Sequence, residues 1–271
     1  MLRPPAVAGA FYSASPAALA EEVTRYLDAS TEPHSALGVI CPHAGLMYSG
    51  HVAGAVLSRV TVPPTVILLG PNHTGRGPAI SVYPKGAWDL PGGAIPVDEV
   101  LAERLLVRFP WGVADTVAHQ SEHCLEVQLP FLRRLRPDLK ILPVVIGTSR
   151  LETCQVLGES LAAITRELTE TGHSRPLLLA STDMSHYEPD DVTRAKDRYA
   201  LAAIERLDPA ALGEAVRTHR ITMCGFAPTL SFLHAARGLG ASRATLVRYA
   251  TSGEVNQVWD RVVGYAGFVV S

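Results

Sequence analysis

Short, continuous runs of apolar residues recur along this chain and constrain its fold more than any other feature. They are rich in valine, isoleucine and leucine, as "TVILLG" and "PLLLA" show. A strand that is apolar on both sides needs cover on both faces of its sheet. We therefore predict strands at 37–41, 65–70, 78–83, 141–146, 176–181, 244–250 and 262–270.

Amphipathic stretches separate most of these strands. A first helix is predicted to begin at Ser15-Pro16, with the Ser15 hydroxyl as N-cap and Pro16 at the first helical position. Further helices are predicted at 50–60, 96–108, 122–136, 150–168, 191–206, 209–218 and 225–238. This alternation predicts a single α/β domain over 1–271, with a mostly parallel or mixed central sheet flanked by helices. The segment 84–96 is short enough to be a loop or hairpin.

Composition excludes several classes of protein. The formal net charge is -2 and 18% of residues are charged, without a basic stripe for nucleic acid or a basic amphipathic face for a membrane surface. No apolar run approaches the roughly 20 residues of a membrane span. Pro4 and Pro5 interrupt the apolar N-terminal stretch, so we expect no signal peptide and a cytoplasmic location. The four cysteines contain no CxxC pair, which argues against a disulfide framework.

Three histidines follow three separate predicted strands. His43 follows "GVICP", His73 lies in "LLGPNHTG", and His186 lies in "STDMSHYEP" after "PLLLA". In open α/β sheets the carboxyl ends of the strands line one crevice, where ligands bind. Each histidine alone could be a turn residue bonded to backbone. Their shared placement favours one site, because imidazole is a common metal ligand and acid/base group.

Two further residues have chemistry that suits such a site. Asp183 precedes His186 by three residues and could hold its imidazole in one tautomer or raise its basicity. Its alternative is an Asx-turn or helix cap. Cys224, in "ITMCGFAPTLSFL", comes just before a predicted helix, whose N-terminus favours a metal-binding thiolate. Its alternative is an inert, buried cysteine.

His123 is predicted to open the helix 122–136, in "HQSEHCLEVQLPFL", with His119, Glu122 and Glu126 nearby. It could be a second acid/base histidine or a substrate contact. A surface residue at a helix start is the alternative. The sequence contains no nucleophile elbow, Walker loop or dinucleotide fingerprint to suggest a different chemistry.

The ordered motifs "PHAGLMYSG", "LLGPNHTG", "SEHCLEVQLPFL", "STDMSHYEP" and "TMCGFAP" resemble the Memo family. Its bacterial members are often called AmmeMemoRadiSam system protein B. The resemblance implies a fold like that of the class III, LigB-type extradiol dioxygenases, which bind non-haem Fe(II) and cleave catechol rings with O2. It implies three metal ligands, His43, His73 and Cys224. It implies three catalytic or pocket residues, His186, Asp183 and His123.

The expected function is that of a metal-binding redox protein, with Fe(II) as cofactor and a small aromatic or catechol-like substrate. A thiolate in place of a carboxylate ligand also admits copper or zinc. One alternative is a zinc-dependent hydrolase with Asp183 or His186 as general base. Another is a non-catalytic metal- or peptide-binding partner protein. The resemblance also implies radical-SAM and AMMECR-type proteins as pathway partners.

Overall fold

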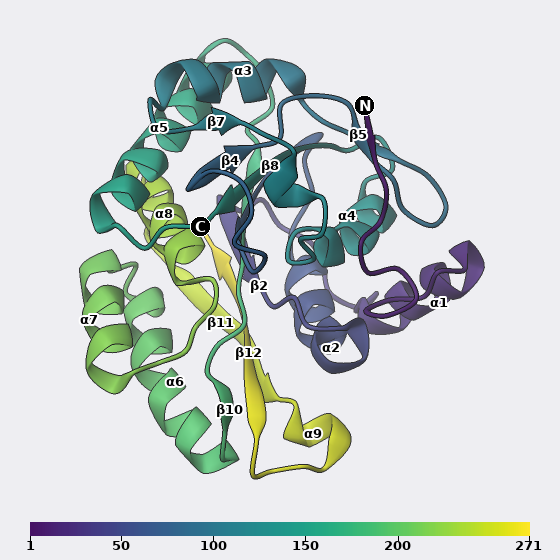
Figure 1. Cartoon of the computed structure of the whole chain (residues 1–271), viewed down its shortest axis with the longest axis vertical. Helices are drawn as coiled ribbons and strands as arrows, with labels where there is room; N and C mark the ends of the chain where they lie inside the picture. The colour runs from purple at the N-terminus through teal and green to yellow at the C-terminus, as the bar shows by residue number, and fades with distance from the viewer.

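The computed structural model describes residues 1–271, and a nine-stranded mixed sheet forms its centre (Figure 1). Its strands are β2 (Gly38–Cys41), β3 (Thr65–Pro71), β4 (Ile80–Val82), β7 (Val113–Ala114), β8 (Lys140–Ile146), β9 (Leu177–Ser181), β10 (His186–Glu188), β11 (Ala244–Thr251) and β12 (Val262–Val270). They follow the order β10-β12-β2-β9-β3-β8-β4-β7, and β11 pairs with β12. The central strands β2, β9, β3 and β8 run parallel.

The helices are α1 (Pro16–Tyr26), α2 (Leu46–Leu57), α3 (Glu99–Arg108), α4 (Leu129–Leu135), α5 (Leu151–Glu170), α6 (Asp190–Glu205), α7 (Pro209–His219), α8 (Phe226–Gly238) and α9 (Gly253–Asn256). A small second sheet joins β1 (Leu2–Arg3), β5 (Ala87–Trp88) and β6 (Ile95–Pro96). The antiparallel pair β5–β6 makes the segment 84–96 a hairpin, one of the two alternatives that the sequence left open. The predicted α/β class with a mixed, helix-flanked sheet is confirmed.

The continuous apolar strands are explained by cover on both faces. Val39 and Val66 belong to the hydrophobic cluster that includes residues of α1, α2 and α4. Their neighbours Ile40 and Ile67 belong to the opposite cluster, with residues of α3, α5 and α8. Figure 1 shows these two groups of helices on either side of the sheet. Successive residues of one strand therefore pack into the cores on opposite faces of the sheet. Residues on both faces need apolar side chains.

Two local predictions are wrong. The helix predicted over 122–136 is a turn, a 3-10 segment (Glu126–Gln128) and the shorter α4. The Glu122 carboxylate accepts hydrogen bonds from the N–H groups of His123 and Cys124, and such local bonds compete with helix formation. Ser15 makes no side-chain cap bond, although Pro16 does start α1. Because Pro16 has no N–H, this helix end has one donor fewer to satisfy.

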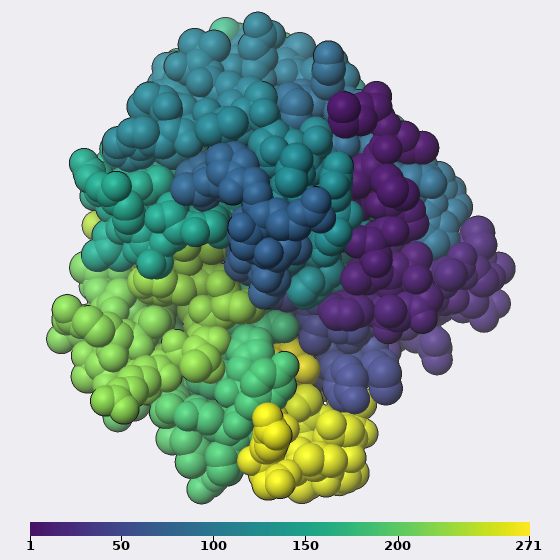
Figure 2. Space-filling model, viewed as in Figure 1, coloured from purple at the N-terminus to yellow at the C-terminus, as the bar shows by residue number.

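The buried ion pair between Arg3 and Glu126 holds the N-terminal segment against the turn that contains Glu122. Arg3 Nη1 lies 2.6 Å from Glu126 Oε2, and Arg3 Nη2 donates to the backbone carbonyl of Glu122. Glu126 also accepts from the Tyr12 hydroxyl and from the N–H groups of residues 6–7. Figure 2 shows the N-terminal segment (purple) lying across the outside of the molecule. The pair thereby fixes two segments that lie far apart in the sequence.

We predict that Glu126→Gln lowers the free energy of unfolding by about 3–5 kcal/mol, because it leaves the Arg3 guanidinium buried without a counter-charge. Urea denaturation followed by circular dichroism measures the change. Glu167→Gln is the matched control, since its pair with Arg108 is exposed to solvent and should contribute at most about 1 kcal/mol. Equal, small losses in both variants would contradict this account of the N-terminal segment.

Candidate metal centre

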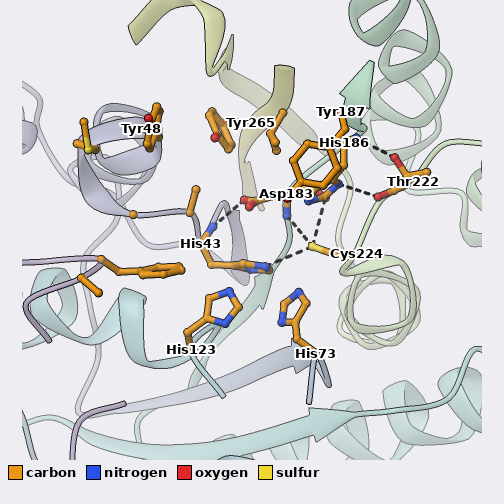
Figure 3. A pocket seen from close by; sticks show the side chains of 16 residues that line it. His43, Tyr48, His73, His123, Asp183, His186, Tyr187, Thr222, Cys224 and Tyr265 are labelled. Carbon is orange, nitrogen blue, oxygen red and sulfur yellow. Dashed lines mark hydrogen bonds between the residues drawn. The ribbon is translucent and has the colours of Figure 1, made fainter. Parts of the chain in front are cut away.

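The carboxyl ends of β2, β3 and β9 converge on one cavity of about 620 Å³. Because β9 lies between β2 and β3 and all three are parallel, the turns after them meet at one edge of the sheet. The cavity is lined by all six residues singled out from the sequence: His43, His73, His123, Asp183, His186 and Cys224. Figure 3 shows their side chains around a common space.

His43 is held in one tautomer by Ser181. The Ser181 hydroxyl donates its only proton to the carbonyl of Cys124 (2.7 Å), so its oxygen must accept from His43 Nδ1–H (2.8 Å). His43 Nε2 is therefore left with a free lone pair. The ring is 1% exposed. Burial, and then the neighbouring histidines, lower the pKa of His43 well below its usual value, which keeps the ring neutral and able to bind a metal.

Glu122 orients the ring of His73, as Ser181 orients that of His43. Its Oε1 accepts from His73 Nδ1 (2.8 Å) and its Oε2 from the His73 backbone N–H (2.6 Å). Burial alone would raise the pKa of Glu122, but the hydrogen bonds from His73 outweigh it and lower the pKa to about 2. A charged carboxylate on Nδ1 fixes the ring and increases the basicity of Nε2. His73 is the most accessible of the clustered imidazoles, with 32% of its side chain exposed.

His123 completes a cluster of three imidazoles. Its ring stacks on that of His73 with centroids 4.6 Å apart, and lies 5.5 Å from that of His43. One potential ligand nitrogen from each of the three residues lies within 4.8 Å of the other two. Phe11, from the fastened N-terminal segment, contacts the His123 ring at 4.9 Å between centroids. The family resemblance implies a catalytic or pocket role for His123, whereas the geometry makes it a candidate ligand as well.

Cys224 contacts only one of these histidines closely. Its Sγ lies 3.3 Å from His43 Nε2 and accepts a hydrogen bond from the N–H of Asp183 (3.2 Å). It does not belong to a three-residue group with ligand atoms within 4.8 Å of one another. Burial, and then the Asp183 carboxyl, raise the pKa of the Cys224 thiol. A bound metal ion would reverse that, because coordination deprotonates a thiol.

Asp183 does not hold the ring of His186, contrary to the sequence-based expectation. Asp183 Oδ1 accepts instead from the backbone N–H of His43 (2.8 Å), which ties the turn after β9 to the turn after β2. Thr222 orients His186: its carbonyl accepts from Nδ1 (2.9 Å) and its hydroxyl from the backbone N–H (2.7 Å). Because a carbonyl only accepts, Nδ1 of His186 carries the proton and Nε2 is free.

The donor set fits a transition-metal ion. Metal–nitrogen and metal–sulfur bonds of about 2.0–2.3 Å place two ligands of one ion about 3–3.7 Å apart. The 3.3 Å between His43 Nε2 and Cys224 Sγ lies in that range. His43 and His73 each have Nδ1 engaged by a partner of their own, as metal-binding histidines usually do. The residues present thus suit an ion with nitrogen and sulfur ligands, such as iron, copper or zinc.

A second group of potential ligands, His73, Glu122 and Cys124, lies behind the first. The two oxygens of Glu122 already accept hydrogen bonds from four N–H groups. Cys124 Sγ–H donates to the carbonyl of Pro71 (3.2 Å). These contacts occupy the atoms that an ion would need, so we assign no metal to this group.

Sequence reasoning missed the residues that orient the histidines. Ser181 is the last residue of an apolar strand, and Thr222 lies in a loop far from His186 in sequence. Glu122 was noted only as a neighbour of His123, yet its main partner is His73, which is 49 positions away. A charged residue that is fully buried is rare unless paired. Burial is not visible in the sequence, so nothing there singled out Glu122.

A family model described as Memo-like protein matches residues 3–269. The chain belongs to the Memo family. It is 38% identical to a MEMO1 family protein from Aquifex aeolicus, with 99% of this chain and 98% of the relative covered. It is 37% identical to one from Methanopyrus kandleri, with 99% of each chain covered. The resemblance stated from the five motifs is therefore confirmed.

The fold of this Memo-family chain also occurs among solved structures. An uncharacterised protein from Escherichia coli K12 matches with a TM-score of 0.56 at 15% identity, covering 84% of this chain and 98% of that one. At this identity the match concerns the fold alone. No helix in the structure is both long enough and apolar enough to traverse a lipid bilayer.

We predict that Glu122→Gln weakens the binding of Co(II) by about 10–100-fold, because an amide neither fixes the His73 ring nor increases its basicity as a carboxylate does. Titration of metal-free protein with Co(II), followed by visible absorbance, gives the dissociation constant. Glu159→Gln, an exposed change on α5, is the matched control and should bind Co(II) like the unmodified protein. An unchanged constant in folded Glu122→Gln protein would contradict the role of Glu122.

Proposed function

We propose that this protein is a metal-dependent oxidoreductase that binds Fe(II) and acts on a small aromatic o-diphenol with O2. His43 and His73 would be two ligands, with Cys224 as the third and His123 as a neighbouring alternative. The observation that carries the proposal is the pair of oriented imidazoles with free Nε2 atoms, beside a thiol 3.3 Å from one of them. Bound Fe(II) would supply the redox chemistry with O2 that no protein side chain provides.

The shape and lining of the cavity support an aromatic substrate. Phe11, Tyr48, Tyr187 and Tyr265 line it together with the histidines, and its volume of about 620 Å³ falls within the usual range of small-molecule sites. Aromatic side chains favour planar rings through stacked or edge-on contacts. The aromatic walls would orient the ring while the polar groups face its hydroxyls.

His186 is the group best placed to move a proton. Thr222 fixes its Nδ1–H, so its Nε2 can accept a proton from a substrate hydroxyl and return it later. Asp183 has a positioning role: by accepting from the His43 N–H it holds the two turns together. Burial raises the pKa of Asp183. His123 would contact the substrate from the wall beside Phe11.

We expect His186→Asn to lower kcat for an o-diphenol by about 10²–10⁴-fold with little change in bound Fe(II), because the variant loses a proton acceptor and not a ligand. Oxygen uptake by protein loaded anaerobically with Fe(II) gives the rate, and metal analysis gives the occupancy. His173→Asn, an exposed change in the loop between α5 and β9 and outside the cavity, is the matched control. A parallel loss of iron and activity would show that His186 is a ligand instead.

Three further measurements distinguish the other functions. Absence of oxygen uptake with any o-diphenol, at a filled iron site, would contradict the dioxygenase proposal. Stoichiometric zinc without a redox response, in protein purified without chelator, would favour a hydrolase. Binding of a radical-SAM or AMMECR-type protein that survives the double change His43→Ala and His73→Ala would favour a non-catalytic partner protein.

A further inference from the structure

The cavity contains no permanently cationic side chain. None of its 16 lining residues is a lysine or arginine, and Asp183 is its one carboxylate. A guanidinium that contacts the lining belongs to Arg261, whose Cζ lies 5.5 Å from the centroid of the Tyr187 ring. Arg261 itself is exposed and does not line the cavity. No lysine or arginine lines the cavity itself, so a negatively charged ligand would meet a permanent positive charge only at Arg261, beside the Tyr187 ring.

Oxygen atoms and aromatic faces gather at one end of the cavity. Figure 3 shows Tyr48, Tyr187 and Tyr265 along the side opposite His73 and His123, with Asp183 between the two groups. Burial raises the pKa of Tyr265, and the nearby Asp183 carboxyl raises it further, as do the hydroxyls of Tyr48 and Tyr187. Tyr48, Tyr187, Tyr265 and Asp183 all line the same cavity. Phenol faces and carboxylates attract cations and repel anions.

We infer that this end of the cavity selects ligands that carry a positively charged ammonium group on an aromatic body, and disfavours those that carry a carboxylate, sulfonate or phosphate. The ammonium group would lie among the three tyrosines and Asp183, with the aromatic body toward the histidines. A bound divalent ion would not reverse this preference, since the Cys224 thiolate and the Asp183 carboxylate would offset its charge.

This inference deepens the proposed function, because it names the charge of the substrate. Its physical basis is the lining of the cavity, which is present without metal or turnover. Charge selection can consequently be measured on metal-free protein. A failure of the inference then remains distinct from a failure of the dioxygenase proposal, which depends on oxygen uptake.

Cys224 provides the reporter for this measurement. It lines the cavity and is partly exposed, whereas Cys41, Cys124 and Cys154 are buried. Three methanethiosulfonates of small size react with a thiolate by forming a mixed disulfide and releasing methanesulfinate. One carries a trimethylammonium group, one a sulfonate and one a neutral methyl group. Mass spectrometry of the intact, metal-free, full-length protein gives the rate, and a single adduct shows that only the exposed thiol reacts.

Each rate is divided by that of the same reagent with free 2-mercaptoethanol, which removes intrinsic differences in reactivity. We expect the cationic reagent to be favoured over the anionic one by about tenfold or more after this correction, since a cleft of one charge sign concentrates the opposite ion. Cys224→Ser should abolish the adduct. Tyr48→Leu and Asp183→Asn should each reduce the preference at least about threefold.

The matched control is Asp138→Asn, which removes one carboxylate from an exposed turn before β8, at the opposite edge of the sheet. It should leave the preference unchanged. Equal corrected rates for the two charged reagents, or a preference for the sulfonate, would overturn the inference. So would equal effects of Asp138→Asn and Asp183→Asn. All rates are compared at one pH at which the neutral reagent forms the Cys224 adduct.

Discussion

The buried carboxylate of Glu122 is the interaction on which the rest of the site depends. It is fully buried, and it accepts four N–H groups from residues on two separate turns. These contacts bring the turn after β3 and the turn before α4 to one place, and they leave His73 Nε2 facing the cavity. Arg3 and Glu126 brace the same turn from the N-terminal side. Ser181 and Thr222 act similarly on His43 and His186, so each of these three rings presents the same nitrogen to the cavity.

The sequence predicted the part of this arrangement that follows from strand order. Apolar runs marked β2, β3 and β9, and the turns after parallel strands meet at one edge, so His43, His73 and His186 could be placed together. It could not show which partner each ring has, because these bonds join residues 36 to 138 positions apart. It also extended a helix through His123, since the competing hydrogen bonds of Glu122 are invisible without the fold. The family resemblance implied that Cys224 is a metal ligand, whereas its place in the sequence alone allowed either a ligand or an inert, buried cysteine.

The two ends of the cavity have different chemical characters. One end gathers imidazoles and a thiol, which suit a soft or intermediate metal ion. The other end gathers phenols around a buried carboxylate, without a lysine or arginine. A ligand that spans both ends needs a group that binds a metal ion at one end. At its other end it needs a positively charged group that contacts the tyrosines and Asp183. Hydrogen bonds orient the imidazoles at the first end, whereas Tyr187 at the second end is 66% exposed.

The most direct measurement is an anomalous-difference map from crystals of protein purified anaerobically and loaded with Fe(II), combined with elemental analysis of the same sample. Our account predicts one iron per chain, with its peak about 2.0–2.3 Å from Nε2 of both His43 and His73. A peak elsewhere, or iron-loaded crystals in which these two nitrogens share no ion, would contradict the proposed centre.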